Sequence, residues 1–587
     1  MNRYEHDVLN ALFEKGFSDQ RSLAFHCGHS LGAVNTALRC LKETGYITRD
    51  CILTERAFEL LRSRRPESAV ILAAGAGLRM IPINSELPKA LLEIQGESLI
   101  ERIIRQLHEV GVFDISVVVG FRKESFEYLI DDYGVKLLVN TEYKTKNNLH
   151  SLRLAAASLQ NTYIIPADLW CAENPFRRSE LYSWYMVSEA ASKESDLRIG
   201  RSLDLKVTEP GLGCRMVGLC YLTGPESAAV RDRVEALCSD PRYDGCYWET
   251  ALYDGAHFSV PARVVPDEKF IELNTYEQLR SLDSSSPNLR SDILDLISAE
   301  LHVPLSDISD ITVLKKGMTN RSFLFMCRGE RYIMRVPGEG TDRLIDRAHE
   351  AEVYSSIASS GFPDEVVYID PATGCKITKY ITGARVCDPF CEDDTKKCMR
   401  LLRQFHGHAF RVEHRFDLFD TIDFYESLWA GAPSVFRDYC SVKRDVFSLR
   451  PYIEAHAGPE VLTHIDAVPD NFLIYNDCGE EKIRLIDWEY AGMQDPHVDI
   501  AMFCIYSSYD REHVEKLIDQ YFSEGCPPET RVKIYCYISV CGLLWSNWCE
   551  YKRNLGVEFG EYSLTQYRFA KEYYHIAVNE IKRPEMK

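Results

Sequence analysis

The stretch Thr463-His-Ile-Asp-Ala-Val-Pro-Asp-Asn471, followed by an apolar run and by Leu485-Ile-Asp-Trp-Glu489, decides how the C-terminal half of the chain is interpreted. Phosphoryl transfer from ATP needs a carboxylate beside the attacking hydroxyl group, together with an Asn and a second Asp that hold Mg²⁺ on the phosphates. Asp466 fits the catalytic base, and His464 fits a residue that orients its loop. Asn471 and Asp487 fit the Mg²⁺ ligands. The spacing therefore predicts an ATP-dependent phosphotransferase.

A second pattern for phosphate chemistry lies far earlier in the chain, in Val70-Ile-Leu-Ala-Ala-Gly-Ala-Gly-Leu-Arg79. Gly75 and Gly77 follow a predicted strand and let backbone N–H groups approach a triphosphate. Arg79 and Lys89 are placed to neutralise the triphosphate charge. A glycine-rich loop alone is a weak signal, because tight turns use glycine as well. Together with the basic residues, however, the loop predicts a second nucleotide-using enzyme in the same chain.

The composition is that of an acidic globular protein. The 587 residues carry a formal net charge of -20, which disfavours nonspecific nucleic-acid binding by the whole chain and suits a cationic substrate. The 20 cysteines form no CxxC pair, which disfavours a zinc site. The N-terminus lacks a signal-peptide pattern, and no apolar run approaches the ~18 residues of a membrane span. We therefore expect a reduced, cytoplasmic protein with no membrane partner.

Three segments are predicted, and together they make a multidomain α/β chain. Residues 1–65 have the order helix, helix-turn-helix and wing, and they resemble the winged-helix family. Residues 66–285 alternate strands and helices, which predicts a doubly wound α/β domain. Residues 290–587 begin with strands around a glycine turn and become mainly helical, as in a two-lobed α+β domain. Because residues 1–65 are only slightly basic, DNA binding, partner docking and oligomer formation all stay open for them.

The first enzyme pattern extends beyond its glycines. Its motifs are LAAGxGxR at 72–79, PKALLEI at 88–94 and a helix from Leu99. With these motifs, about residues 68–280 closely resemble the sugar-phosphate and phosphocholine nucleotidylyltransferases. The resemblance implies a Rossmann-like (GT-A) fold in which Asp168, after the strand Ile164-Ile-Pro, holds Mg²⁺.

Two positions bear on the substrate and the metal of this domain. The segment Asn147-Asn-Leu-His-Ser-Leu152 is more similar to the phosphocholine enzymes than to the sugar enzymes, which implies a substrate contact at Asn148. Where the family has a second metal-binding Asp, this chain has Asn274. Either Glu272 replaces that ligand or one Mg²⁺ suffices.

The C-terminal half resembles the choline and ethanolamine kinases over about residues 305–580. Lys316-Gly317-Met-Thr-Asn320 is similar to their phosphate loop, which implies that Gly317 and Asn320 bind nucleotide. Arg335 stands where protein kinases carry the strand lysine, and Arg at this place is typical of the choline kinases. Glu350 is the expected acidic partner of Arg335, with Glu352 as the alternative.

The acceptor pocket is predicted near the C-terminus. Trp545 and Trp548 lie three residues apart and so share one helix face. They are either core aromatics or a cation–π wall for a quaternary ammonium group. The resemblance to choline kinases, which carry a WxxW helix followed by a segment like Phe559–Phe569, favours the wall. Glu489 is a further candidate for substrate binding.

The two resemblances together imply a bifunctional enzyme of CDP-choline synthesis. The kinase half would use ATP to make phosphocholine from choline, and the transferase half would use CTP to make CDP-choline and pyrophosphate, both with Mg²⁺. The sequence leaves ethanolamine open as the acceptor and does not fix the nucleotide base. The alternatives are a sugar kinase fused to a sugar-1-phosphate nucleotidylyltransferase, and a transcription regulator that senses nucleotide or choline.

Overall fold

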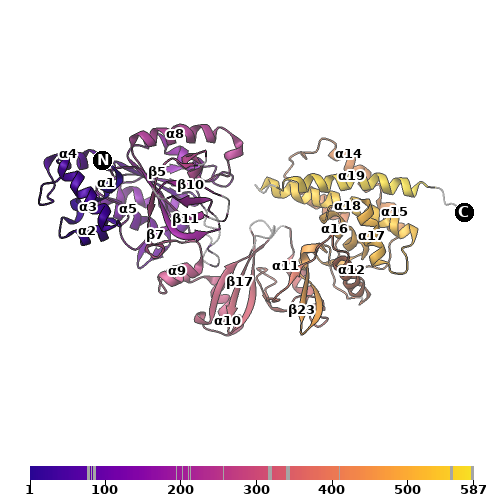
Figure 1. The fold of residues 1–587 in the computed structure, drawn as a ribbon. Helices are drawn as coiled ribbons and strands as arrows, with labels where there is room; N and C mark the ends of the chain where they lie inside the picture. Colours follow the sequence, from indigo (N-terminus) through magenta and orange to yellow (C-terminus); the bar gives the residue numbers. More distant parts are fainter. Residues whose placement is uncertain are drawn as a thin grey trace. The chain divides into compact units, whose positions relative to one another are not determined.

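The computed structural model of the chain forms two compact units, Met1–Leu296 and Ile297–Lys587 (Figure 1). It describes residues 1–583 except 76–79, 81, 83–86, 194, 201–202, 209–210, 212, 256, 315–319, 339–343, 409 and 556–558.

The first unit begins with four short helices. They are α1 (Arg3–Lys15), α2 (Gln20–Cys27), α3 (Leu31–Glu43) and α4 (Glu55–Ser63). Side chains of Asn2, Asp19 and Ser30 accept hydrogen bonds from backbone N–H groups at the starts of the first three helices, which explains where these helices begin. The predicted pair of wing strands is reduced to a single antiparallel bridge between Ile47 and Leu53.

These helices pack against the domain that follows. The Asp7 carboxylate accepts hydrogen bonds from the Tyr182 hydroxyl at 2.9 Å and lies 2.8 Å from His29 Nε2. The guanidinium of Arg3 donates to the same tyrosine oxygen at 3.2 Å. Leu181 is buried in the core of the four helices. Residues 1–65 therefore pack against the segment around Leu181 and Tyr182, and buried polar contacts hold them there.

The main sheet of the first unit has seven strands in the order β14-β8-β11-β6-β1-β4-β5. The strands are β1 (Ser68–Ala73), β4 (Asp114–Val119), β5 (Lys136–Val139), β6 (Thr162–Pro166), β8 (Trp184–Ser192), β11 (Gly213–Leu222) and β14 (Ala262–Val264). The pairs β1–β4, β1–β6 and β4–β5 are parallel, whereas β11 is antiparallel to both β6 and β8. The sheet is therefore mixed, which corrects the expectation of an ordinary doubly wound sheet.

Helices cover both faces of this sheet, as the alternation of strands and helices predicts. In β1, Ile71 belongs to the core that contains helix α5 (Leu99–Glu109), and its neighbour Val70 belongs to the core that contains α7 (Asn148–Leu154) and α8 (Gly224–Cys238). Successive side chains of a strand point to opposite faces, so both faces of β1 are buried. This burial explains the continuous apolar run before Gly75.

A short ribbon beside the sheet brings distant residues together. Strand β7 (Leu169–Cys171) pairs antiparallel with β15 (Phe270–Glu272), with Glu272 opposite Leu169. The backbone N–H of Leu273 donates to the carbonyl oxygen of Asp168 at 2.9 Å. Asp168 and the segment 272–274 therefore lie side by side.

The serine-rich segment 281–288, for which the composition predicts a linker, is held in place. Helix α9 (Tyr276–Leu282) runs into it, and the Asp283 carboxylate then accepts a hydrogen bond from the Gln95 backbone at 2.7 Å. The Ser286 hydroxyl donates to the carbonyl oxygen of Glu93 at 2.7 Å. Asp and Ser side chains that bond to backbone groups order this stretch, although its composition is typical of a linker.

Helix α10 (Asp292–Leu301) runs across the boundary between the two units, and the second unit then forms a five-stranded antiparallel sheet in the order β16-β17-β18-β20-β19. The strands are β16 (Ile308–Val313), β17 (Asn320–Cys327), β18 (Glu330–Pro337), β19 (Val366–Ile369) and β20 (Lys376–Lys379), and helix α11 (Arg347–Ile357) follows β18. The turn at Gly329, with φ at 85°, joins β17 to β18 as the sequence predicts.

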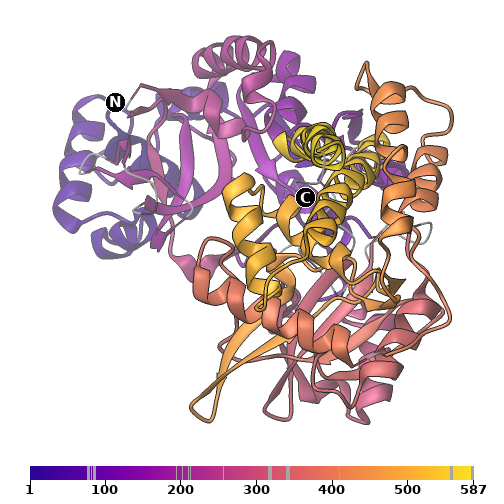
Figure 2. The same cartoon turned by 90° about the vertical axis from the view of Figure 1, so that its right-hand side faces the viewer.

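The rest of the second unit is mainly helical. Its helices are α12 (Glu392–Gly407), α13 (Leu418–Ser427), α14 (Tyr439–Phe447), α15 (Arg450–Ala455), α16 (His497–Tyr506), α17 (Arg511–Tyr521), α18 (Pro528–Asn554) and α19 (Glu561–Ile581). The long helices α18 and α19 lie against each other (Figures 1 and 2). Two small ribbons carry the motif segment: β22 (Val461–Thr463) pairs with β25 (Gly492–Gln494), and β23 (Phe472–Asp477) pairs with β24 (Glu480–Leu485). Among the described helices, none is both long and apolar enough to cross a membrane.

Replacing Tyr182 by Ala tests the docking of residues 1–65. The change leaves the buried Asp7 carboxylate without one hydrogen bond, which costs about 1–3 kcal/mol. We expect faster amide hydrogen exchange across α1 and earlier proteolytic cleavage within residues 1–65. Phe25→Ala is the control, because Phe25 is 84% exposed. Equal exchange in α1 of Tyr182→Ala and Phe25→Ala would contradict the docking described above.

Candidate active sites

A cavity of about 1030 Å³ lies in the first unit at the carboxyl ends of β1 and β6. Ligands of open α/β sheets commonly bind at this edge. The cavity brings together predicted residues from five separate stretches of chain. They are Gly75, Lys89, Asn148, Asp168, Glu272 and Asn274. Gly77 and Arg79, which the sequence also predicts for this site, lie outside the described residues.

Lys89 contacts two other polar residues that line this cavity. Its ammonium group lies 2.5 Å from the Asp168 carboxylate and donates to the amide oxygen of Asn274 at 2.8 Å. A second carboxylate at position 274 would bring more negative charge to this ammonium group. The structure thus shows what the departure from the family pattern does: Asn274 helps to hold Lys89, and Glu272 lines the same cavity.

The same cavity has aromatic lining residues, and sequence reasoning missed them. Trp248, Tyr185, Tyr253 and Glu249 line it. The rings of Tyr185 and Trp248 are 6.1 Å apart, and the Tyr185 hydroxyl donates to Glu249 Oε1 at 3.1 Å. The other carboxylate oxygen, Oε2, is buried and has no partner among the described residues. Burial raises the pKa of Glu249 to about 7.

Asn148 connects the segment of Trp248 to helix α7. Its side-chain oxygen accepts a hydrogen bond from the backbone N–H of Trp248 at 2.7 Å. Asn147 caps the helix by accepting from the N–H of Asn148. The two adjacent Asn residues singled out in the sequence therefore fix the start of α7 and the position of Trp248.

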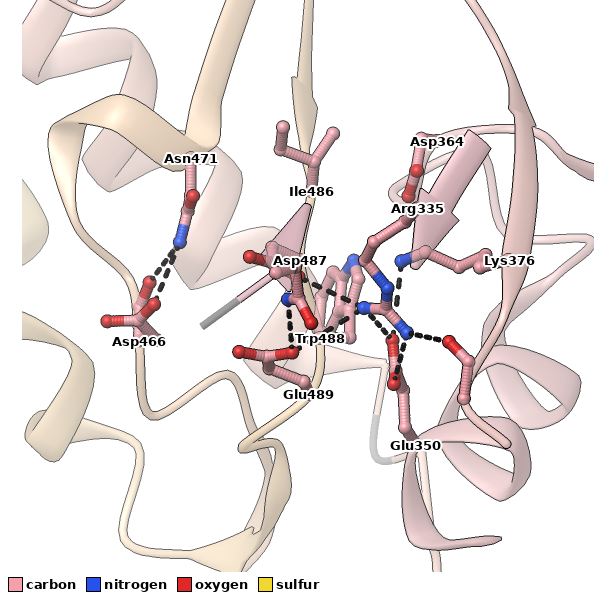
Figure 3. A network of polar contacts seen from close by, with 12 residues as sticks. Arg335, Glu350, Asp364, Lys376, Asp466, Asn471, Ile486, Asp487, Trp488 and Glu489 are labelled. Carbon is pink, nitrogen blue, oxygen red and sulfur yellow. Dashed lines mark hydrogen bonds and ion pairs between the residues drawn. The ribbon is translucent and has the colours of Figure 1, made fainter. Parts of the chain in front are cut away.

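The second site lies in the second unit, where Asp466 and Asn471 face each other (Figure 3). The amide nitrogen of Asn471 donates to the carbonyl oxygen of Asp466 at 2.9 Å and to its carboxylate at 3.1 Å, so the amide oxygen is turned away. Asp487 follows β24 and has a φ of 67°. A non-glycine residue at positive φ stores backbone strain, which is common at functional sites.

Burial controls the charge of the motif loop. It raises the pKa of Asp466 to about 8, with the negative charges of Asp487 and Glu489 adding to the effect. Burial also lowers the pKa of His464 to about 4, so this imidazole is neutral. His464 Nε2 lies 3.0 Å from the carbonyl oxygen of Ile486, which ties the Asp466 loop to the segment before Asp487.

Asp499, on helix α16, supports the same loop and was not predicted. Its carboxylate accepts hydrogen bonds from the backbone N–H groups of His464 at 3.0 Å and Ile465 at 2.8 Å. Ile465 has a φ of 68°, so the loop is strained where Asp499 holds it. The HVD segment itself carries no signal of this role, because Asp499 accepts from backbone N–H groups of a distant segment.

Arg335 and Glu350 form the predicted ion pair. Both guanidinium nitrogens of Arg335 bind the Glu350 carboxylate at 2.6 Å, and Nη1 also lies 3.4 Å from Asp487 (Figure 3). Burial alone would raise the pKa of Glu350, but Lys376, Arg335 and Arg347 hold it at about 2. Glu352, the alternative, instead accepts from the Glu413 backbone at 2.9 Å.

Two cations of this network were missed by sequence reasoning. Lys376, on β20 and opposite Arg335 in the strand register, lies 3.3 Å from Glu350 (Figure 3). Arg347, on α11, lies 3.3 Å from Glu350 and 3.2 Å from Glu489. Glu489 itself accepts from the Asn320 amide at 2.8 Å. Asn320 and Glu489 are therefore part of this network, and Gly317 lies outside the described residues.

The two predicted tryptophans are packed edge to face. The rings of Trp545 and Trp548 are 5.5 Å apart at 68°, and Tyr490 meets Trp545 at 5.4 Å. Both indoles are buried, with Trp548 1% and Trp545 6% exposed. Burial, followed by the charges of Asp466 and Glu489, raises the pKa of Tyr425. Tyr425 is therefore close enough to Asp466 to be influenced by its charge.

Both sites offer the ligands that Mg²⁺ prefers, namely carboxylate and amide oxygens. Among the described residues, no three His, Cys, Asp or Glu side chains form a group that holds a metal by itself. Mg²⁺ is commonly bound by one or two carboxylates and completed by substrate phosphates. The donor sets Asp168 with Glu272, and Asn471 with Asp487, therefore fit ions shared with a nucleotide.

Comparisons with known families assign each half separately. Residues 69–181 match the MobA-like NTP transferase domain, and residues 310–535 match the phosphotransferase enzyme family. Both ranges include polar residues of the sites described above.

Three curated proteins are similar to parts of the chain. The choline-phosphate cytidylyltransferase of Streptococcus pneumoniae is 30% identical over 227 residues, 38% of this chain and 98% of that protein. The 2-aminoethylphosphonate cytidylyltransferase of Lancefieldella rimae is 31% identical over 225 residues, 37% of this chain and 92% of that protein. Protein LicA of Haemophilus influenzae is 25% identical over 262 residues, 42% of this chain and 95% of that protein. The chain belongs to the choline-phosphate cytidylyltransferase family, fused in this enzyme to a domain of the phosphotransferase enzyme family.

Proposed function

We propose that the protein makes CDP-choline in two steps. The second unit transfers the γ-phosphoryl group of ATP to the hydroxyl of choline, and the first unit joins the phosphocholine to CMP from CTP with release of pyrophosphate. The observation that carries the proposal is the cavity of the first unit, which is lined by Lys89 and Asp168 and also by Glu249 with aromatic rings. Such a cavity has a partner for a phosphate and a partner for a cation.

The kinase step follows from the chain's own groups. Asp466 accepts the proton of the attacking hydroxyl as the bond to phosphorus forms. Arg335, fixed by Glu350, neutralises ATP phosphate charge. Mg²⁺, held by Asn471 and Asp487, would supply further charge neutralisation on the phosphates. The raised pKa of Asp466 makes its carboxylate a stronger base than an ordinary aspartate.

The cytidylyl step needs no protein base, because the attacking phosphate is already an anion. Lys89 neutralises the charge that develops on the triphosphate, and Asp168 and Asn274 keep its ammonium group in place. Asp168, with Glu272 beside it, would hold Mg²⁺. Catalysis at this site is positioning and charge neutralisation.

A cationic head group accounts for the aromatic features of both sites. In the first unit, Glu249 and the rings of Trp248 and Tyr185 line the same cavity. In the second unit, the packed rings of Tyr490 and Trp545 are the aromatic candidates. Quaternary ammonium groups are recognised by aromatic faces. A sugar offers no such charge, and this observation disfavours the sugar kinase alternative.

The matched 2-aminoethylphosphonate enzyme makes an aminoalkyl phosphonate the second candidate acceptor for the first unit. Such a molecule carries a primary ammonium group, which a carboxylate can bind by hydrogen bonds. The kinase domain favours phosphocholine, since a phosphonate needs no phosphorylation. Ethanolamine phosphate is distinguished from phosphocholine by comparing both in the same assay.

The N-terminal segment is proposed to be a winged helix with an accessory role in the first unit. The order of α1 to α4 and the Ile47–Leu53 bridge support this, and so does the docking of α1 through Asp7. A shift assay with duplex DNA at physiological salt tests the alternative of a DNA-binding regulator.

Asp466→Asn is expected to lower choline phosphorylation by about 10²–10⁴-fold, because the general base is lost. Formation of CDP-choline from supplied phosphocholine and CTP should stay unchanged. The two activities are measured separately by mass spectrometry of the products. Asp477→Asn, in the β23–β24 hairpin, is the matched control. Parallel loss of both activities would contradict two independent sites.

Lys89→Ala is expected to have the reverse effect. Phosphocholine should accumulate from choline and ATP, while CDP-choline formation falls by about 10²-fold or more, the usual cost of losing one preorganised charge contact. Lys123→Ala, an exposed lysine of the same unit, serves as the control. Full cytidylyl transfer in Lys89→Ala would remove this residue from the site.

Glu249→Gln is expected to raise KM for phosphocholine about tenfold, which corresponds to ~1.4 kcal/mol. In the natural protein, KM should rise as the pH falls below the pKa of about 7, because Glu249 then loses its charge. The change centred near pH 7 should be absent from the variant, since Gln does not titrate, and only the titration of the substrate phosphate near pH ~6 should remain. Glu235→Gln, an exposed residue of α8, is the control. A KM that is unchanged in Glu249→Gln at high pH would exclude Glu249 as the partner of the cation.

A further inference from the structure

Arg347 occupies the centre of the buried network in the second unit. Its Nη1 atom lies 3.3 Å from Glu350 and 3.2 Å from Glu489, and its Nη2 donates to the Asn320 amide oxygen at 3.4 Å. The side chain is only 6% exposed. One guanidinium group therefore contacts the start of β17, the first turn of α11 and the segment that follows Asp487.

The position of Arg347 is unfavourable by local rules. It is the first residue of α11, where the helix dipole favours negative rather than positive charge. The helix is capped by Asp346, whose carboxylate accepts from the N–H groups of Ala348 and His349. A buried cation at this position is stabilised by its pairing with Glu350 and Glu489. Its placement thus depends on one contact within the helix, to Glu350, and on contacts to Glu489 and Asn320 outside it.

Gly374 provides the space for this side chain. It has a φ of 74°, and a Cβ atom built on it would lie 2.6 Å from Cδ and from Nε of Arg347. The carbonyl oxygen of Gly374 also accepts from Nη2 of Arg335 at 3.1 Å. The turn before β20 therefore fits only a residue without a side chain, and it contacts both arginines of the network.

We propose that Arg347 is a positioning residue of the phosphotransferase half, which fixes Glu350 against Arg335 and Glu489 against Asn320. The inference rests on the proposed kinase function. Arg347 does not touch the reacting groups. It sets the orientation of Arg335 and Asn320, to which the proposed function assigns the ATP phosphates, relative to Asp487. Only a forked guanidinium group can reach all three partners at once, so a lysine does not replace it.

Two independent changes disturb the same contact. Arg347→Lys keeps the charge but loses the fork, and Gly374→Ala leaves Arg347 intact but pushes its side chain out of place. Gly329→Ala is the matched control for the glycine, because Gly329 also has positive φ, at 85°, and nothing lies within 4 Å of a Cβ built there. All variants are made in the full chain, and melting curves confirm that each is folded.

We expect both Arg347→Lys and Gly374→Ala to lower kcat of choline phosphorylation by about 10²-fold, the usual cost of a displacement near 1 Å, and to raise KM for ATP about tenfold. KM for choline and the cytidylyl step should stay unchanged. Gly329→Ala should keep the natural kcat and KM at a melting temperature lowered by a similar amount. A loss of stability in Arg347→Lys with unchanged KM for ATP and unchanged kcat per folded molecule would overturn the proposal.

A double-mutant cycle tests whether Arg347 acts through Glu489. If it does, Arg347→Lys combined with Glu489→Gln is no worse than the more damaged single variant, because coupled residues are not additive. Multiplied losses in kcat would overturn this route.

The outcome is separable from the proposed function. Should the natural protein fail to phosphorylate choline while binding Mg²⁺ and a non-hydrolysable ATP analogue with CTP saturating the first unit, the choice of acceptor is wrong. Arg347 is then judged by the affinity for the analogue in the variants, where an unchanged affinity would contradict the inference.

Discussion

The pairing of buried charge is the constraint on which the kinase half depends. The Glu350 carboxylate is fully buried, and a lone carboxylate in that environment would be strongly destabilising. Three cations, from β18, β20 and the start of α11, surround it. Because each cation comes from a different segment, the carboxylate fixes the mutual positions of a sheet and a helix. The motif segment with Asp487 and Glu489 is then attached through the same arginines.

The first unit meets the same constraint with fewer charges. Lys89 lies between one carboxylate and one amide, so its own charge is balanced by Asp168 before a nucleotide binds. An Asp at position 274 would add a negative charge beside Lys89, whereas Asn274 adds none. Glu249, in the same cavity, forms no ion pair with any residue that the structure describes, whereas Asp168 does. Its second oxygen is buried without a partner among the described residues, and burial raises its pKa. An unpaired acidic group in a cavity has a physical reason to be kept only if a ligand supplies the missing charge.

Much of both sites could be predicted from the sequence, because the motifs combine a strand or turn with polar residues at fixed spacing. The ion pair of Arg335 with Glu350, and the meeting of Lys89 with Asp168, follow from such patterns. Glu249, Arg347, Lys376 and Asp499 could not be predicted in this way. Each lies in a segment without a motif, and each reaches its site through strand register or helix packing that connects distant parts of the chain. The antiparallel β11 escaped prediction for the same reason, since the direction of a strand is not encoded in its own residues.

The docking of the first helix has a consequence for synthesis of the protein. Asp7 and Tyr182 are separated by 175 residues, yet they share one hydrogen bond. The N-terminal helices leave the ribosome first, and at about 5–20 residues per second their partner follows only after roughly ten seconds or more. During that time the Asp7 carboxylate lacks its partner Tyr182, whereas His29 lies in the same N-terminal segment. The N-terminal segment is therefore synthesised before Tyr182, and its docking is completed only after Tyr182 has been made. Contacts of such long sequence separation slow the folding of the unit to which the segment belongs.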